Sequence, residues 1–79
     1  MQSPNHDLSA LFAQLGLPAD SASQELFVRQ HAPLAEHIRL ADAPFWNAAQ
    51  AALLREQLSA DADWAEVVDQ LNLLLRRPH

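Results

Sequence analysis

The chain has 79 residues, a net charge of −5, no cysteine and 49% hydrophobic residues. Without cysteine it has no disulfide framework and no zinc site built on thiolates. Its apolar runs fall far short of the roughly 18 residues that a membrane-spanning helix needs, and its first seven residues lack the basic start and apolar core of a signal peptide. We therefore expect a single small domain over residues 1–79, located in the cytoplasm and not in a membrane.

The charged residues argue against binding to nucleic acid. Ten acidic residues are spread over both halves of the chain, all five basic residues are arginines, and lysine is absent. Nucleic-acid binding depends on neutralising backbone phosphates, which requires a basic block. We expect the one basic pair, Arg76–Arg77, to complement the negative end of the last helix instead. The sequence thus predicts no nucleic-acid partner and no contact with an anionic membrane surface.

Composition and spacing predict helices from the start of the chain. Alanine and leucine supply 29 of the 79 residues, whereas threonine is absent. The first segment has apolar residues at i, i+3, i+4 and i+7, namely Leu8, Leu11, Phe12 and Leu15. Gly16, the only glycine, follows the last of them, where a left-handed residue closes a helix. This pattern predicts a helix over residues 7–15.

A second helix is predicted over residues 21–31, beginning at Asp20 or Ser21. Ser21 and Gln24 have the spacing of a capping box, in which each side chain binds the backbone amide of the other. His31 falls in the last turn, where its imidazole is expected to bind free carbonyl groups. Pro33 disfavours helical geometry in the residue before it and so ends the segment.

Residues 32–46 are predicted to form an ordered connector that lies across the core, and residues 47–60 a third helix. Asn47 and Gln50 form a second capping-box pattern at the start of that helix. Its buried face is predicted to consist of Ala51, Leu54 and Leu58. The connector is the segment with the weakest periodicity, with Ile38 on its apolar side.

The fourth helix, over residues 63–76, has the clearest pattern in the chain. Asp63 and Glu66 have the spacing of a helix cap. The apolar face runs without a break through Trp64, Val67, Val68, Leu71, Leu74 and Leu75. We expect this helix to be the most buried and to pack on the first and third helices. The predicted fold class is all-α, a compact bundle of four short helices.

Five segments together resemble a known family. In chain order they are residues 11–18 (LFAQLGLP), 31–34 (HAPL), 43–46 (APFW) with Gln50, 61–65 (DADWA) and 68–71 (VDQL). In content and order these blocks resemble domain of unknown function 2789, a short proteobacterial family. The resemblance spans nearly the whole chain. It implies a stand-alone, cytoplasmic, all-helical protein, but no reaction, cofactor or partner.

The sequence supports no catalytic or metal site. No two histidines have i, i+4 spacing on one helix, the positions being His6, His31, His37 and His79. With Gly16 as the only glycine, no phosphate-binding loop is present. Asp61 and Asp63 are interpreted as a helix cap rather than as an acid–base pair. We assign no catalytic, cofactor-binding or metal-binding residue and expect no cofactor, and we leave enzymatic activity open while leaning against it.

The aromatic residues supply the candidate interaction residues. Phe45 and Trp46, together with Trp64, Phe12 and Phe27, are expected to close the core. The alternative is that Phe45 and Trp46, on their proline-led turn, are partly exposed and form a hot spot for a partner. The preferred hypothesis is a non-enzymatic protein–protein interaction module that binds another protein or itself, with a homodimer expected. The alternative is a small-molecule-binding protein or small enzyme whose inter-helical pocket is lined by Trp46, Trp64 and His31.

Overall fold

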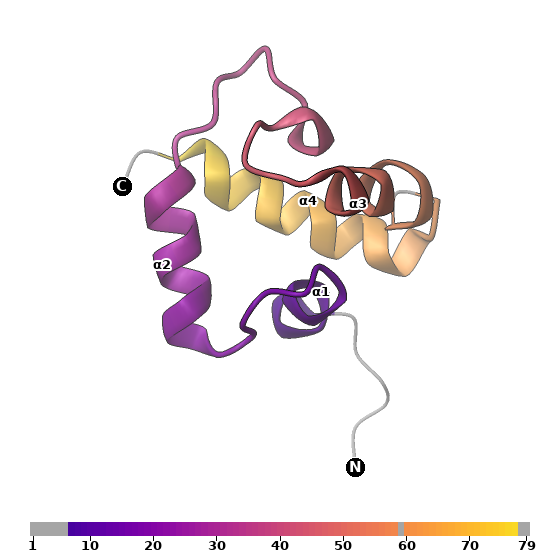
Figure 1. Ribbon diagram of the computed structural model, residues 1–79, viewed down its shortest axis with the longest axis horizontal. Helices are drawn as coiled ribbons and strands as arrows, with labels where there is room; N and C mark the ends of the chain where they lie inside the picture. Colours follow the sequence, from indigo (N-terminus) through magenta and orange to yellow (C-terminus); the bar gives the residue numbers. More distant parts are fainter. Residues whose placement is uncertain (1–6, 59, 78–79) are drawn as a thin grey trace.

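The computed structural model describes residues 7–58 and 60–77, and in this part of the chain it contains helices and connecting segments without a strand. The elements are α1 (Leu8–Gln14), α2 (Ser21–His31), a 3-10 helix η1 (Leu40–Asp42), α3 (Ala48–Ala52), a π-helix η2 (Leu53–Leu58) and α4 (Ala62–Arg76). The predicted all-α fold class with four helical segments is confirmed. α4 runs through the middle, with α1 on one side, α3 on the other, and α2 at its C-terminal end (Figure 1).

α1 begins and ends as the sequence predicts. The side chain of Asp7 accepts a hydrogen bond from the Ala10 amide at 2.9 Å and so caps the N-terminus. Gly16 has φ +73°, a left-handed conformation that residues with a side chain rarely adopt. At that end Gly16 N–H donates to Ala13 O and Leu17 N–H to Phe12 O. These two bonds form a Schellman motif, which stops the helix at the predicted glycine.

The predicted capping box at Ser21 is wrong, although the bounds of α2 are correct. Asp20 is the N-cap, and its carboxylate accepts hydrogen bonds from the amide and the hydroxyl of Ser23. The Gln24 side chain, which was expected to return to Ser21, instead donates to Ala19 O at 2.7 Å and to Ser9 Oγ at 3.0 Å. Because Asp20 already caps α2, the Gln24 side chain is not needed for the cap. It links α2 to α1 instead.

The third predicted helix begins as expected but changes type. Both hydrogen bonds of the Asn47–Gln50 capping box are present. After five α-helical residues the chain continues as η2, so residues 47–60 do not form one α-helix; residue 59 lies outside the described part. A side-chain amide hydrogen of Gln50 donates to Leu15 O at 2.8 Å, which ties α3 to the end of α1. Capping and tertiary contact are thus combined in one side chain.

α4 supplies the centre of the core. It starts one residue before the predicted position, and the cap is Asp61 rather than Asp63, since the Asp61 carboxylate accepts from the Asp63 amide at 2.9 Å. α4 packs against α1, α2 and η2, which confirms the expected contacts with the first and third helical segments. The buried residues come from every element except α3, and they are Leu11, Phe12, Leu15, Val28, Leu34, Leu40, Ala43, Trp46, Leu54, Leu58, Val67, Leu71 and Leu75.

The connector is ordered and is held by the end of α4. Leu34 N–H donates to Leu75 O at 2.6 Å. The guanidinium of Arg76 donates to the carbonyl oxygens of Leu34, Ala35 and Ile38, and its Nε donates to Asn72 Oδ1 at 3.0 Å. Arg76 lies in the last turn of α4, where the sequence predicted that it would complement the negative end of the helix. Arg76 binds carbonyl groups, but those of the connector.

Replacing Leu71 tests whether α4 is central to the core. Leu71 has no exposed surface, so Leu71→Ala removes buried methyl groups and leaves a cavity. We expect the free energy of unfolding, measured by urea denaturation, to fall by about 2–5 kcal/mol. Leu73→Ala on the same helix is the matched control, because Leu73 is 58% exposed, and its effect should stay within about 0.5 kcal/mol. Equal losses for the two variants would contradict this packing.

Replacing Arg76 tests the attachment of the connector. Hydrogen bonds from a charged donor contribute about 1.5–3 kcal/mol, so Arg76→Ala should lower the free energy of unfolding by about 2 kcal/mol. Thermal denaturation should show this as a melting temperature lower by roughly 10 °C. The neighbouring exposed arginine provides the control, since Arg77→Ala should leave the melting temperature almost unchanged. A similar shift for both variants would argue that only the charge near the helix end matters.

Candidate functional site

Three of the four predicted site residues meet in one aromatic cluster centred on Phe27 of α2. The ring of Phe27 stacks on Trp46, with centroids 5.4 Å apart, and meets Phe45 edge-on at 5.6 Å. His31, one turn further along α2, stacks on Phe45 with centroids 4.2 Å apart. Phe12 of α1 meets Phe27 edge-on at 5.5 Å. The cluster therefore joins the end of α2 to the turn before α3.

Trp46 lies inside this cluster as a core residue. Its side chain is 8% exposed, and its Nε1–H donates to Leu40 O at 2.7 Å, so its one polar group is satisfied within the fold. Phe45 is half-buried and packs against the core. The turn that carries Phe45 and Trp46 thus closes the core, which was the first of the two interpretations from the sequence. An additional contact of Phe45 with a partner stays a prediction.

His31 and Trp64 differ from the sequence expectations. The imidazole of His31 packs against the rings of Phe27 and Phe45, and it forms no hydrogen bond with carbonyl groups among residues 7–58 and 60–77. Trp64 is half-buried in the first turn of α4, about 16 Å along the helix axis from Leu75, whose carbonyl binds the connector. Trp64 therefore lies at the opposite end of α4 from the point where Leu34 is bound, and the predicted pocket of Trp46, Trp64 and His31 stays a prediction.

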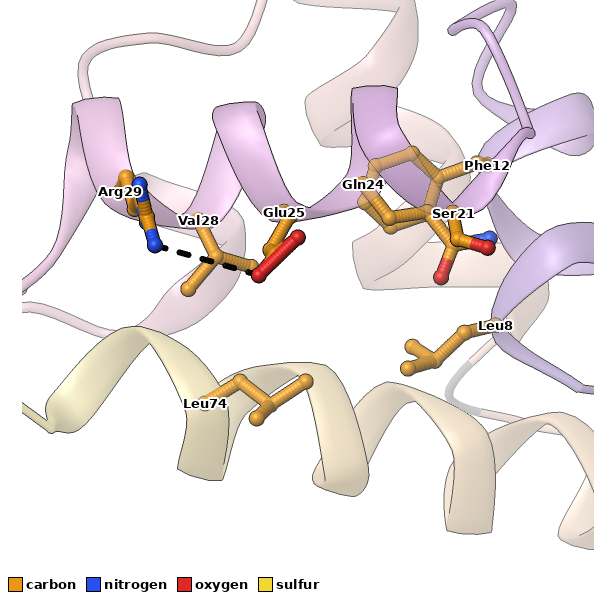
Figure 2. Close-up of a pocket in the computed structure, with 8 residues that line it drawn as sticks. All are labelled: Leu8, Phe12, Ser21, Gln24, Glu25, Val28, Arg29 and Leu74. Atoms are coloured by element: carbon orange, nitrogen blue, oxygen red, sulfur yellow. Dashed lines mark ion pairs between the residues drawn. The ribbon is translucent and has the colours of Figure 1, made fainter.

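A groove of about 350 Å³ lies instead between α1, α2 and α4. Figure 2 shows Leu74 of α4 and Leu8 of α1 across from Val28 of α2. The apolar lining residues are Leu8, Phe12, Val28 and Leu74, and the polar ones, all on α2, are Ser21, Gln24, Glu25 and Arg29. An apolar floor beneath a polar edge is typical of a site that binds an amphipathic ligand or protein segment.

The groove exists because the part of the chain that the structure describes covers α2 only partly. Among the residues of α2, all of which the structure describes, Val28 alone is buried, and Leu26 is 56% exposed. The Gln24 side chain holds the first turns of α2 near Ala19 and Ser9, leaving the side that carries Glu25 and Arg29 open. No sequence pattern predicted this groove, because its lining comes from three helices and local spacing does not record their separation.

The two charged side chains at the edge of the groove interact only weakly with each other. Arg29 Nη2 lies 3.9 Å from Glu25 Oε2, with both side chains about two-thirds exposed or more, so this pair contributes little to stability. At the start of α2, hydrogen bonds from the hydroxyl and the amide of Ser23 hold the pKa of the Asp20 carboxyl below its ordinary value. The N-terminus of α2, which forms one wall of the groove, is therefore capped by an ionised carboxylate. The middle of α2 carries two exposed charges of opposite sign.

Other parts of the described chain offer less chemistry. A second hollow of about 310 Å³ lies between η1, η2 and α4, and the Arg55–Asp42 ion pair, with Nη2 and Oδ1 2.6 Å apart, spans it. Residues 7–58 and 60–77 contain no group of three or more potential metal ligands; His6 and His79 lie outside them. Within the same residues no helix has the length and apolar character required to cross a membrane.

Comparison with known proteins supports the fold but assigns no activity. The sequence model of a family described as "Protein of unknown function (DUF2789)" matches residues 1–75. The solution NMR structure of a structural-genomics target protein from Chromobacterium violaceum is 44% identical, with a TM-score of 0.78. The match covers 100% of this chain and 99% of that one. The search of curated proteins found no match.

The Asp20 cap predicts a pH dependence for the wall of the groove. The folded-state pKa is depressed, so this cap stabilises α2 above the ordinary carboxyl pKa of 3.8, and the stabilisation is lost as the pH falls through the folded value. We expect the Ser23 amide resonance, followed by NMR, to shift and to exchange faster with solvent below pH 3.8. In Asp20→Asn, which caps without titrating, this transition should be absent. An unchanged acid transition in Asp20→Asn would assign it to another group.

Proposed function

The chain belongs to DUF2789, a family of unknown function, and we propose that it is a non-enzymatic interaction module of one domain that acts in the cytoplasm. Its binding surface is the groove between α1, α2 and α4, and the occupant is an amphipathic helix of another protein. The observation that carries the proposal is the apolar floor formed by Leu8, Val28 and Leu74 beneath the polar edge of α2 (Figure 2).

A helix is the occupant that best fits the shape of this groove. Its walls are the two helices α2 and α4, and helix-in-groove binding places apolar side chains at i, i+3, i+4 and i+7 against such a floor. Covering α2 would also bury its side chains, of which only Val28 is buried without a partner. Burial of apolar surface would therefore supply most of the binding free energy.

The charges at the edge specify which helix would bind. Glu25 and Arg29 are one helical turn apart and bind each other only weakly, so both can pair with a partner. A matching helix carries a basic and an acidic residue one turn apart, next to its apolar stripe. Such pairing fixes register and selects partners more than it raises affinity.

A peptide selection tests the groove without requiring the natural partner. We expect a display library of amphipathic helical peptides to yield binders with apolar residues at helical spacing, because the groove accepts that pattern. NMR titration with a selected peptide should shift the amide resonances of Leu8, Val28 and Leu74 most. Glu25→Trp should abolish binding, since an indole at this position fills the groove.

The matched control is Gln30→Trp, which introduces the same indole on the other flank of α2. This variant should bind the selected peptides as wild type does, and circular dichroism should show both variants to be equally helical. A library that yields no binder beyond a scrambled-pattern control would overturn the proposal. Binding that survives Glu25→Trp would place the site elsewhere.

A small amphipathic molecule is the second candidate occupant, favoured by the volume of the groove. About 350 Å³ is at the lower end of the range for small-molecule sites. Exchanging the two edge charges, by Glu25→Arg together with Arg29→Glu, distinguishes the candidates. The exchange should change which peptides are selected, whereas apolar fragments that bind the floor in an NMR screen should be unaffected.

A further inference from the structure

The outward side of α4 carries an exposed leucine between two charges of opposite sign. Leu73 is 58% exposed, with Asp69 four residues before it and Arg77 four residues after it. Residues at i and i+4 lie along one side of a helix, and Arg77, the C-cap residue of α4, follows Leu73 by the same spacing, so the three side chains form a stripe. We call Asp69, Leu73 and Arg77 the α4 stripe. All three are exposed, and the stripe faces away from the core.

The two charged side chains of the α4 stripe have no polar partner among the described residues. In residues 7–58 and 60–77 neither Asp69 nor Arg77 forms a side-chain hydrogen bond or an ion pair. They lie eight positions apart, about 12 Å along the helix, so they cannot pair with each other. Asp69 also faces Arg39 and Arg76 across a shallow hollow, without forming an ion pair with either.

We propose that α4 pairs with α4 of a second copy of this chain, antiparallel, about a two-fold axis through Leu73. In such an isologous contact Leu73 meets Leu73 of the second copy. The same axis places Asp69 opposite Arg77 of the second copy and Arg77 opposite Asp69. A parallel arrangement would place like charges opposite each other. The order acid, leucine, base is therefore complementary to itself only when the two helices are antiparallel.

The overall charge favours this face over the rest of the surface. The chain carries −5, so two copies repel each other over most approaches. Along the exposed side of α4, however, the charges of Glu66 and Asp69 are partly offset by that of Arg77. The repulsion is therefore reduced where the stripe lies, and the two ion pairs set the orientation of the encounter.

The expected dimer is weak, because one helix crossing buries little surface. Stable dimers bury about 800 Å² on each partner, which would be a large share of the 5200 Å² that this chain exposes. We therefore expect dimers only at protein concentrations above about 100 µM. This inference goes beyond the proposed function, because it concerns another side of α4 and a different partner, and it does not depend on the groove.

Sedimentation equilibrium of the full chain, from about 10 µM to about 1 mM, tests the contact. Wild type should shift from monomer to dimer over this range. Leu73→Asp should remain monomeric, because it places two carboxylates at the two-fold axis. Leu26→Asp is the matched control, since Leu26 is 56% exposed on α2, and it should dimerise as wild type does. A wild type that stays monomeric at the highest concentration would overturn the inference and leave the groove proposal in place.

Charge reversal tests the antiparallel register. Asp69→Arg alone and Arg77→Asp alone should each weaken the dimer about tenfold, since each replaces two attractive pairs by repulsive ones. A mixture of these two variants should form heterodimers as stable as wild type, because each of the two contacts then again joins an arginine of one copy to an aspartate of the other. Failure of the mixture to associate would contradict the register. A dimer that persists in Leu73→Asp but is lost in Glu25→Trp would place the contact at the groove and overturn the inference.

Discussion

The fold depends on how the carbonyl groups of the connector find hydrogen-bond donors. The segment between α2 and η1 has no regular structure to satisfy its own backbone, and unpaired carbonyls near the core are costly. One guanidinium, that of Arg76, donates to Leu34, Ala35 and Ile38, and Leu75 O receives the amide of Leu34. The last turn of α4 thereby fixes the path of the connector, on which the placement of Phe45 and Trp46 depends.

The packing of the aromatic residues and of α2 depends on this attachment of the connector. With the connector held, the indole N–H of Trp46 reaches Leu40 O, and its ring lies against Phe27. The aromatic cluster joins one side of α2 to the rest of the protein, and Gln24 joins its first turns to α1. Among residues 7–58 and 60–77, the remaining surface of α2 has no such neighbour. The groove is thus the consequence of a short chain that covers α2 on one side only.

Local signals predicted the fold better than they predicted the site. Gly16 and the Asn47–Gln50 pair act within a few residues of themselves, and the structure confirms both. Gln24 and Arg76 bind groups 15 and up to 42 positions away, which no local pattern records. His31, Phe45 and Trp46 do converge, but as packed rings. The groove depends on the separation of α2 and α4, a property of tertiary packing, and could not be predicted from the sequence.

The order of charges along α4 has a role in the single chain as well. Acidic residues early in the helix and arginines at its end complement the helix dipole, whichever side of the helix they occupy. Stability of the monomer therefore accounts for their order but not for their position on one side with a leucine between them. A polar residue at position 73 would serve an exposed helix surface equally well. It is the alignment of Asp69, Leu73 and Arg77 on one side, rather than the charge gradient, that points to a second copy.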